Sequence, residues 1–210
     1  MDRGYLKTMA KNQIRGNIGI LFAITLIIEL ISFAAIFVLG WVGPLGSAVN
    51  SFITPAFSLS MAIIYLNLAK GVKPRIEDAF SGFNDFWSAF KIYFFIGLFT
   101  LLWGLLFIIP GIIKMYSYSM APYILAENKQ MPALEAIRRS KEMMNGHKMD
   151  LFELLLSFIG WDLLGVVTFG IAYIWITPYQ NATMVNFYNT IKPCEMFDEP
   201  EKFNNPEIEI

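Results

Sequence analysis

The chain has 210 residues, of which 56% are apolar and only 16% are charged. Soluble domains average about 45–50% apolar and about 25% charged residues, so a soluble fold of this size would not bury the apolar surface present here. The composition therefore indicates a polytopic membrane protein and excludes a disordered chain, a collagen, a coiled coil and a small disulfide scaffold. The net charge of −1 gives no overall basic field for nucleic acid, and the single cysteine, Cys194, forms no intrachain disulfide.

Six apolar segments approach the length of about 20 residues that a membrane-spanning helix needs. They cover residues 17–40, 46–69, 88–109, 111–126, 149–167 and 169–190, and the fourth is the shortest and most polar. Lipid offers backbone groups no hydrogen-bond partners, so all six are predicted to be helices. The predicted fold is an all-α polytopic membrane bundle, with one transmembrane domain over residues 1–191 and a mobile acidic tail over residues 192–210.

Basic residues predict the orientation of these helices. Lys and Arg precede the first segment, lie between the second and third and between the fourth and fifth, and follow the sixth. The other three connections are short and carry neither, and Lys114 alone falls elsewhere. Cytoplasmic loops hold the positive excess, so both termini are predicted to be cytoplasmic in a multi-pass protein of the cell membrane. The first apolar run is too long for a signal-peptide core and is expected to be retained.

The segments form three hairpins that show signs of an internal repeat. Lys11, Gly16 and Phe22 recur at an offset of 130 residues as Lys141, Gly146 and Phe152. The second helix of every hairpin also carries a proline after a small residue, in the pairs Thr54-Pro55, Ala121-Pro122 and Thr177-Pro178. Pro55, Pro122 and Pro178 are predicted to kink or loosen their helices. A repeated hairpin occurs in transporters, but also in membrane proteins that transport nothing.

An amphipathic stretch precedes each hairpin. These stretches favour helices on the inner leaflet whose basic groups face anionic lipid, although solvated connecting loops are the alternative. The basic groups are Lys7, Lys11, Arg15, Arg138, Arg139 and Lys141. The aromatic residues near the predicted boundaries, Trp41, Trp161 and Tyr173 outside and Tyr65, Trp87, Tyr93, Tyr123 and Tyr188 inside, are typical of interfacial belts.

The sequence contains no HExxH motif, no G-x-S-x-G motif and no glycine-rich phosphate-binding loop, and we expect no cofactor. Its one histidine, His147, and the distant Cys194 do not supply the three or four ligands of a zinc site, so no metal is expected.

Charged residues within the predicted spans are costly and usually face the bundle interior. Lys114 and Asp162 lie at comparable depths near the outer side, so they are predicted either to pair, directly or through water, or to reach outer water independently. Glu29 lies in the middle of the first span without an evident partner. It is expected to be protonated, hydrogen-bonded to Ser or Thr, or open to a cavity.

Further polar residues lie on the inner faces of the predicted spans. Together with the charged residues they make a candidate polar seam of Glu29, Asn50, Thr54, Ser58, Lys114, Tyr118, Glu153, Ser157, Asp162, Tyr173, Thr177 and Asn181. The functional interpretation is a hydrated path or a pocket for a lipid head group or peptide. The alternative is interhelical hydrogen bonding and close packing of small residues.

Several segments resemble one protein family. AKNQIRGN, LLWGLLFIIPGII, YSYSMAPYILAEN, SKEMMNGHKMDLFELLLSFIGW and TPYQNATMVNFY are similar to the bacterial integral-membrane domain-of-unknown-function family 975. The likeness is most specific in IIPGI, APYILAEN and LSFIGW. That family is loosely similar to the membrane domains of glycerophosphodiester phosphodiesterases. The resemblance implies a bacterial cell membrane and supplies no catalytic residues.

These patterns lead to an ordered set of functional hypotheses. The first is a non-enzymatic membrane accessory or scaffold that binds lipid, a protein partner or another copy of itself, and no nucleic acid. The second is a small transporter or channel that uses the polar seam, and an intramembrane enzyme is the third. A continuous cavity that touches Glu29, Thr54 and Thr177 would favour transport, whereas a closed bundle would favour the scaffold.

Overall fold

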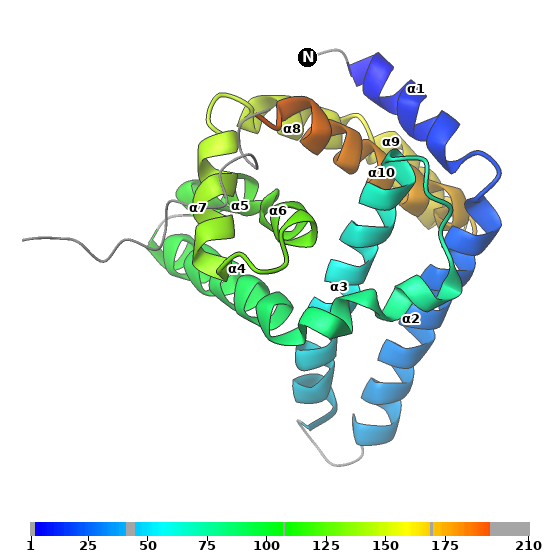
Figure 1. The fold of residues 1–210 in the computed structure, drawn as a ribbon, viewed down its shortest axis with the longest axis horizontal. Coiled ribbons are helices and arrows are strands. Elements are labelled where there is room, and N and C mark those ends of the chain that lie inside the picture. Colours follow the sequence, from blue (N-terminus) through cyan, green and yellow to red (C-terminus); the bar gives the residue numbers. More distant parts are fainter. Residues whose placement is uncertain (1–2, 41–44, 107, 169, 194–210) are drawn as a thin grey trace, which may run out of the picture.

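The computed structural model describes residues 3–40, 45–106, 108–168 and 170–193, and within them the chain forms only helices (Figure 1). The predicted all-α class is therefore confirmed for the described residues. The elements are α1 (Arg3–Ile14), α2 (Ile18–Gly40), α3 (Leu45–Ala69), the 3₁₀ helix η1 (Ile76–Asp85), α4 (Phe86–Leu106), α5 (Ile108–Tyr118), α6 (Ala121–Glu127), α7 (Ala133–Met143), α8 (Lys148–Leu156), α9 (Ile159–Val167) and α10 (Tyr173–Ile191).

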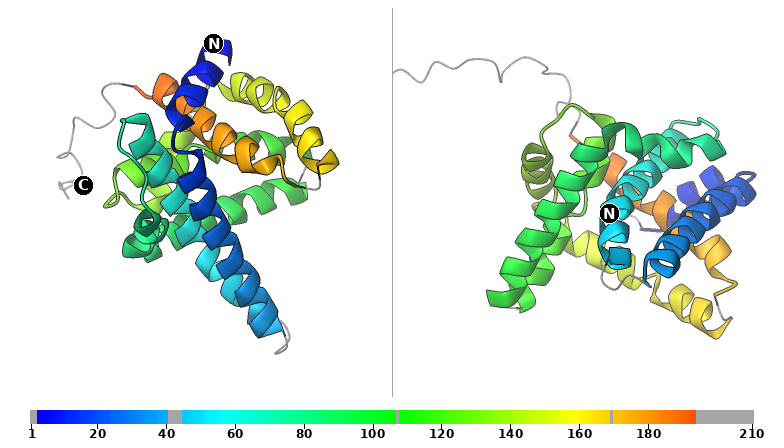
Figure 2. Two further views of the ribbon diagram at one scale, coloured as in Figure 1. Left: turned by 90° about the vertical axis from the view of Figure 1, so that its right-hand side faces the viewer. Right: turned by 90° about the horizontal axis from the view of Figure 1, so that it is seen from below.

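Helix α3 lies at the centre of the molecule. It contacts α2, α4, α6, α10 and η1, and its side chains Leu59, Ile64 and Tyr65 are almost wholly buried. The hairpin of α2 and α3 projects as a separate arm, while α1, α8 and α10 lie near the other end of α3 (Figures 1 and 2). The core therefore sits where the second helices of the hairpins meet.

Three apolar stretches are long enough to cross a membrane. They are Ile18–Val38, Val49–Ala69 and Ile76–Leu105, which correspond to the first three predicted spans. In the 18-residue apolar window of the first stretch and of the third, only 11% of the residues are buried inside the protein. Large side chains such as Phe33, Phe37 and Leu105 therefore face outward, as lipid-facing residues do.

The predicted fourth span, 111–126, is not one helix but the two short helices α5 and α6. The break at Ser119 and Met120 is stabilised by two hydrogen bonds, each between a serine hydroxyl and a backbone group. Ser119 Oγ donates to the Tyr116 carbonyl at 2.8 Å, and the Met120 amide donates to Ser140 Oγ at 3.2 Å. Pro122 sits in the first turn of α6, where its missing N–H costs nothing, so it begins a helix instead of kinking one.

The predicted fifth span, 149–167, is likewise divided, into α8 and α9. Ser157 at the junction turns its hydroxyl back to the Leu154 carbonyl, and the ammonium of Lys7 donates to the Ser157 carbonyl at 3.1 Å. The predicted sixth span, 169–190, corresponds to α10, which begins at Tyr173 instead of residue 169. The described residues therefore contain three helices that are long and apolar enough to be single spans, and not the six that were predicted.

The internal repeat is visible in the backbone. Gly16 and Gly146, the repeat-related glycines, both have φ of +86°. Helices α1 and α7 begin at residues 3 and 133, and α2 and α8 begin at residues 18 and 148. All these positions keep the offset of 130 residues, so an amphipathic helix, a left-handed glycine and a more apolar helix form the repeated unit. Of the predicted tail, Lys192 and Pro193 are described, and 194–210 lie outside the described residues, as does Trp41.

Candidate functional site

A cavity of about 480 Å³ lies between α2, α3 and α10. It gathers five of the predicted seam residues, listed in chain order as Glu29, Asn50, Thr54, Ser58 and Thr177. Every one comes from a hairpin helix, and the cavity touches the three residues whose joint exposure favours transport over a closed scaffold. The Thr54 hydroxyl donates a hydrogen bond at 2.8 Å to the Asn50 carbonyl, which lies one turn back along α3.

Glu29 is the only charged residue on this cavity among the described lining residues. Its carboxyl makes no hydrogen bond or ion pair with any described residue, and its side chain is exposed. It also lines a second cavity, of about 310 Å³, together with Thr25, Tyr173 and Thr177. Glu29 therefore borders two cavities, and a cavity is one of the surroundings expected for it.

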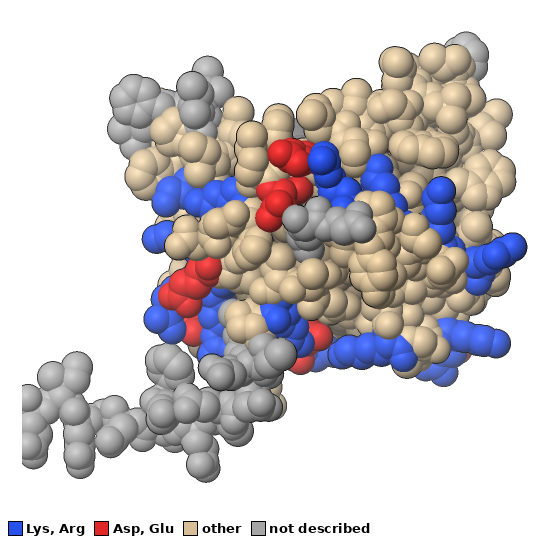
Figure 3. Space-filling model, turned by 90° about the horizontal axis from the view of Figure 1, so that it is seen from above, with Lys and Arg blue, Asp and Glu red and all other residues tan. Residues whose placement is uncertain are grey.

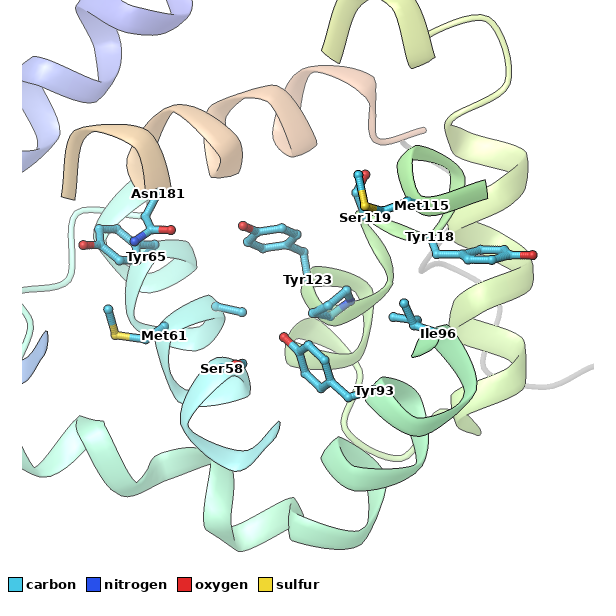
Figure 4. Close-up of a pocket in the computed structure, with 12 residues that line it drawn as sticks. Ser58, Met61, Tyr65, Tyr93, Ile96, Met115, Tyr118, Ser119, Tyr123 and Asn181 are labelled. Carbon is cyan, nitrogen blue, oxygen red and sulfur yellow. The ribbon is translucent and has the colours of Figure 1, made fainter. Parts of the chain in front are cut away.

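A third cavity, here called the central cavity, has a volume of about 460 Å³ and is lined by residues of α3, α4, α5, α6 and α10 (Figure 4). Its lining includes four tyrosines and the polar residues Ser58 and Asn181; the tyrosines are Tyr65, Tyr93, Tyr118 and Tyr123. Figure 4 shows the hydroxyl of Tyr93 directed toward Ser58. This central cavity shares Ser58 and Met61 with the Glu29 cavity, so the two adjoin.

The sequence predicts that Tyr65, Tyr93 and Tyr123 belong to an interfacial belt, but in the structure all three line the central cavity. One signal was present in the sequence: Tyr65 and Tyr188 each follow the proline of their helix by ten residues. Repeated positions on second helices face the common core, and Tyr65 and Tyr188 are indeed almost wholly buried.

Among the described residues, the buried Oδ1 of Asn50, which lines the Glu29 cavity, has no hydrogen-bond partner. The hydroxyl of Tyr65 points away from the other tyrosines of the central cavity and has the Asn181 carboxamide as its polar neighbour (Figure 4). Buried polar groups are paired in native structures unless water or a ligand completes them.

The predicted direct pair of Lys114 and Asp162 is not formed. Asp162 Oδ1 instead accepts a hydrogen bond from Gln180 Nε2 at 2.7 Å, beside a cavity of about 470 Å³ that Asn181 also lines. The Lys114 ammonium lies over the ring of Trp103, 4.6 Å from its centroid. Lys114 therefore contacts an aromatic ring and Asp162 contacts a neutral amide, and the two residues are not each other's partner.

Two further seam residues lie away from the cavities, at the contact between α1 and the α8–α9 junction. Glu153 pairs with Arg3 at 3.3 Å, and the Ser157 carbonyl accepts the hydrogen bond from Lys7. The ammonium of Lys7 also sits 4.1 Å from the ring centroid of Phe158. Burial, with the charges of Lys11 and Arg3, lowers the pKa of the Lys7 amine.

Some of the predicted basic groups pair with a carboxylate of the same chain, and others are exposed. Arg138 and Arg139 both hydrogen-bond to Glu135, at 2.7 and 2.9 Å, and these bonds lower the pKa of that carboxyl. Arg15 and Lys141 are exposed. Figure 3 shows Lys and Arg gathered over the middle and lower edge of one face, while the lobes at its upper corners are almost free of charge.

A buried carboxylate that sequence reasoning missed joins the ends of three helices. Glu127, at the end of α6, accepts a hydrogen bond from the Tyr188 hydroxyl at 2.8 Å and also pairs with Lys192. Lys70, just beyond α3, lies 3.6 Å away. These contacts fasten the three second helices together on the side that carries the basic residues.

No group of His, Cys, Asp and Glu in the described part of the chain could hold a metal ion. His147 Nδ1 instead lies 3.1 Å from Asp150 Oδ2 at the start of α8.

Over the described residues, the helices therefore define the class: an all-helical protein in which three helices are long and apolar enough to cross a membrane. The chain belongs to the family described as "Protein of unknown function (DUF975)", whose model matches residues 1–117 and 105–195. No curated protein and no solved structure matches the chain.

Proposed function

We propose that this chain is a multi-pass protein of the bacterial cell membrane with six crossings and cytoplasmic termini. In this arrangement α5 with α6, and α8 with α9, each make one crossing as a broken helix, and α10 makes the sixth. Broken helices occur at membrane depth where the freed backbone groups find protein partners. The hydrogen bonds of Ser140 and Lys7 supply such partners at the two breaks. The looser likeness to phosphodiesterase membrane domains belongs to this proposal and adds no catalytic residue.

We infer that the protein is a small, non-enzymatic transporter or channel. The observation that supports this most strongly is the cavity that joins Glu29, Thr54 and Thr177. A carboxyl at mid-membrane depth is costly and typically marks a solute or ion pathway. Shared lining residues connect this cavity to the one at Tyr173 and to the central one, so a path of polar groups runs between the hairpins.

The test is solute entry into vesicles that contain the purified protein. The vesicles are shrunk in glycerol, ammonium chloride or tetraethylammonium chloride, and their reswelling is followed by light scattering. The proposal expects at least one solute to enter several-fold faster than into empty vesicles, and Glu29→Gln to remove that gain. Glu77→Gln, at an exposed residue of η1, is the matched control. Entry at the empty-vesicle rate for all three solutes contradicts the proposal.

A lipid-binding scaffold is the second candidate, and a specific surface favours it. The 3₁₀ helix η1 and the start of α4 expose Ile76, Phe80 and Trp87, and the cations Arg15 and Lys141 of the other two amphipathic segments are also exposed. Exposed apolar and basic groups of this kind suit an anionic inner leaflet, a protein partner or a second copy. Reduced co-purification of anionic lipid with the double variant Arg15→Gln/Lys141→Gln would support this candidate; unchanged lipid content would contradict it.

A further inference from the structure

The charged residues that line the cavities indicate the sign of the charge on a ligand. Glu29 is the one formally charged residue among the described lining residues of the Glu29 cavity, the Tyr173 cavity and the central cavity. None of these lining residues is Lys, Arg or His. In a site of low dielectric a single carboxylate attracts cations strongly and repels anions.

The aromatic lining of the central cavity suits the same sign. Tyrosine ring faces attract cations within about 6 Å of the ring centroid, and more strongly where water is excluded. Tyr65, Tyr93 and Tyr123 stand around the cavity in Figure 4, and Tyr123 is held by stacking on Tyr188 at 5.7 Å between centroids. The thioethers of Met61 and Met115 add polarizable, apolar surface.

An unpartnered buried polar atom gives an independent indication that a ligand completes the site. The Oδ1 of Asn50, a residue that lines the Glu29 cavity, is buried and has no hydrogen-bond partner among the described residues. This atom can only accept a hydrogen bond. It is suited to a positively charged group, either as a hydrogen-bond acceptor or as the negative end of a dipole.

We propose that the joined cavities bind a lipophilic organic cation, with its charge near Glu29 and its apolar body among the tyrosines and methionines of the central cavity. This proposal rests on the transporter function and names its substrate class. The two cavities, of about 480 and 460 Å³, each fall within the usual range of small-molecule sites.

The experiment compares two probes of nearly the same shape and opposite charge. Purified full-length protein in detergent is titrated calorimetrically with tetraphenylphosphonium and with tetraphenylborate. The proposal expects saturable binding of the phosphonium at least tenfold tighter than that of the borate. Equal or tighter binding of the borate overturns it.

Variants separate the site from partition into detergent. Glu29→Gln is expected to weaken phosphonium binding about tenfold, whereas the exposed control Glu77→Gln leaves it unchanged. Tyr93→Phe should retain affinity because the ring remains, and Tyr93→Leu should lose it several-fold. If Glu29→Gln and the control bind the phosphonium with equal affinity, the proposal is overturned. This result does not depend on whether Tyr93→Leu folds.

Failure of this inference is distinguishable from failure of the transporter proposal. Phosphonium binding that depends on Glu29, without any solute entry into vesicles, contradicts transport and leaves the cation site standing. Protein-dependent entry of glycerol, together with equal binding of the two probes, supports transport and contradicts the cation site.

Discussion

At the scale of single residues, Glu127 shows how a charge can be central without being conspicuous in the sequence. It ends a short helix after the APYILA segment, among residues typical of a loop. In the structure its side chain is 9% exposed and meets Lys70, Lys192 and Tyr188. Only the folding of three helix ends toward one point makes this carboxylate important, and no spacing along the chain reveals that convergence.

Replacing this carboxylate should destabilise the bundle. Glu127→Gln leaves two ammonium groups without their shared counter-charge, so we expect a loss of about 2–3 kcal/mol in the free energy of unfolding. Thermal unfolding of the purified protein in detergent measures it. Glu77→Gln, whose side chain is 84% exposed, should change stability by less than about 0.5 kcal/mol. A midpoint for Glu127→Gln equal to that of the control would contradict the role given to Glu127.

At the scale of elements, the left-handed glycines make the repeat testable. Gly16→Ala and Gly146→Ala each force a side chain into φ of +86° and should each cost about 1–2 kcal/mol. Gly19→Ala, inside α2 with nothing within 4 Å of the added carbon, should be neutral or stabilising by up to about 1 kcal/mol. The measurement is thermal unfolding, and a repeat with equivalent halves predicts similar losses at Gly16 and Gly146. Tolerance of alanine at either position would contradict it.

The contact of η1 with α3 depends on a different glycine. Gly82 donates its amide to Ser60 Oγ at 2.8 Å, and a Cβ at Gly82 would stand 2.1 Å from the Ala56 carbonyl oxygen. Gly82→Ala should therefore separate η1 from α3 at a cost of about 1–3 kcal/mol. Gly97→Ala on α4, where the new carbon meets nothing, is the matched control. Equal susceptibility of the two variants to protease cleavage near Ser81 would speak against this packing.

The salt links of α7 predict a pH dependence. Hydrogen bonds from Arg138 lower the pKa of Glu135 in the folded protein, with further help from Arg139. Their stabilisation is therefore present at pH values above the unfolded pKa of 4.5 and is lost as pH falls through the lower folded value. Hydrogen exchange in α7 should accelerate over that acidic range relative to Glu135→Gln, in which this part of the pH dependence disappears. The same acid response in both proteins would refute the assignment.

Hydropathy predicted the first three spans closely because α2, α3 and α4 are long, apolar and uninterrupted. Hydropathy failed at the fourth and fifth predicted spans because an average hydropathy over a window of residues contains no information on where a side chain forms a hydrogen bond with a backbone group. Ser140 accepts the Met120 amide from a helix 20 residues away, and Lys7 reaches the Ser157 carbonyl across 150 residues. Such breaks depend on tertiary partners, which the local pattern does not contain.

At the scale of the whole molecule, helix faces predicted part of the candidate site. Asn50, Thr54 and Ser58 share a face of α3, and that face lines a cavity together with Thr177 and with Glu29, for which the sequence suggested no partner. Lys114 and Asp162 did not meet, because equal depth does not fix which helices are neighbours. The tyrosines of the central cavity were missed for a related reason: a tyrosine at an interface and one in a core look alike in sequence.

The most direct test of the central claim, that this is a membrane protein with its cations on the cytoplasmic side, is the accessibility of single cysteines in intact cells. With Cys194 replaced by serine, exposed positions near the predicted outer turns, Ile112 and Ile171, are changed to cysteine, as are the exposed Asn12 and Glu142 on the basic side. A membrane-impermeant maleimide should label the first pair from outside and the second pair only after the cells are opened. Labelling of Asn12 or Glu142 from outside, or recovery of the protein in the soluble fraction, would contradict the account.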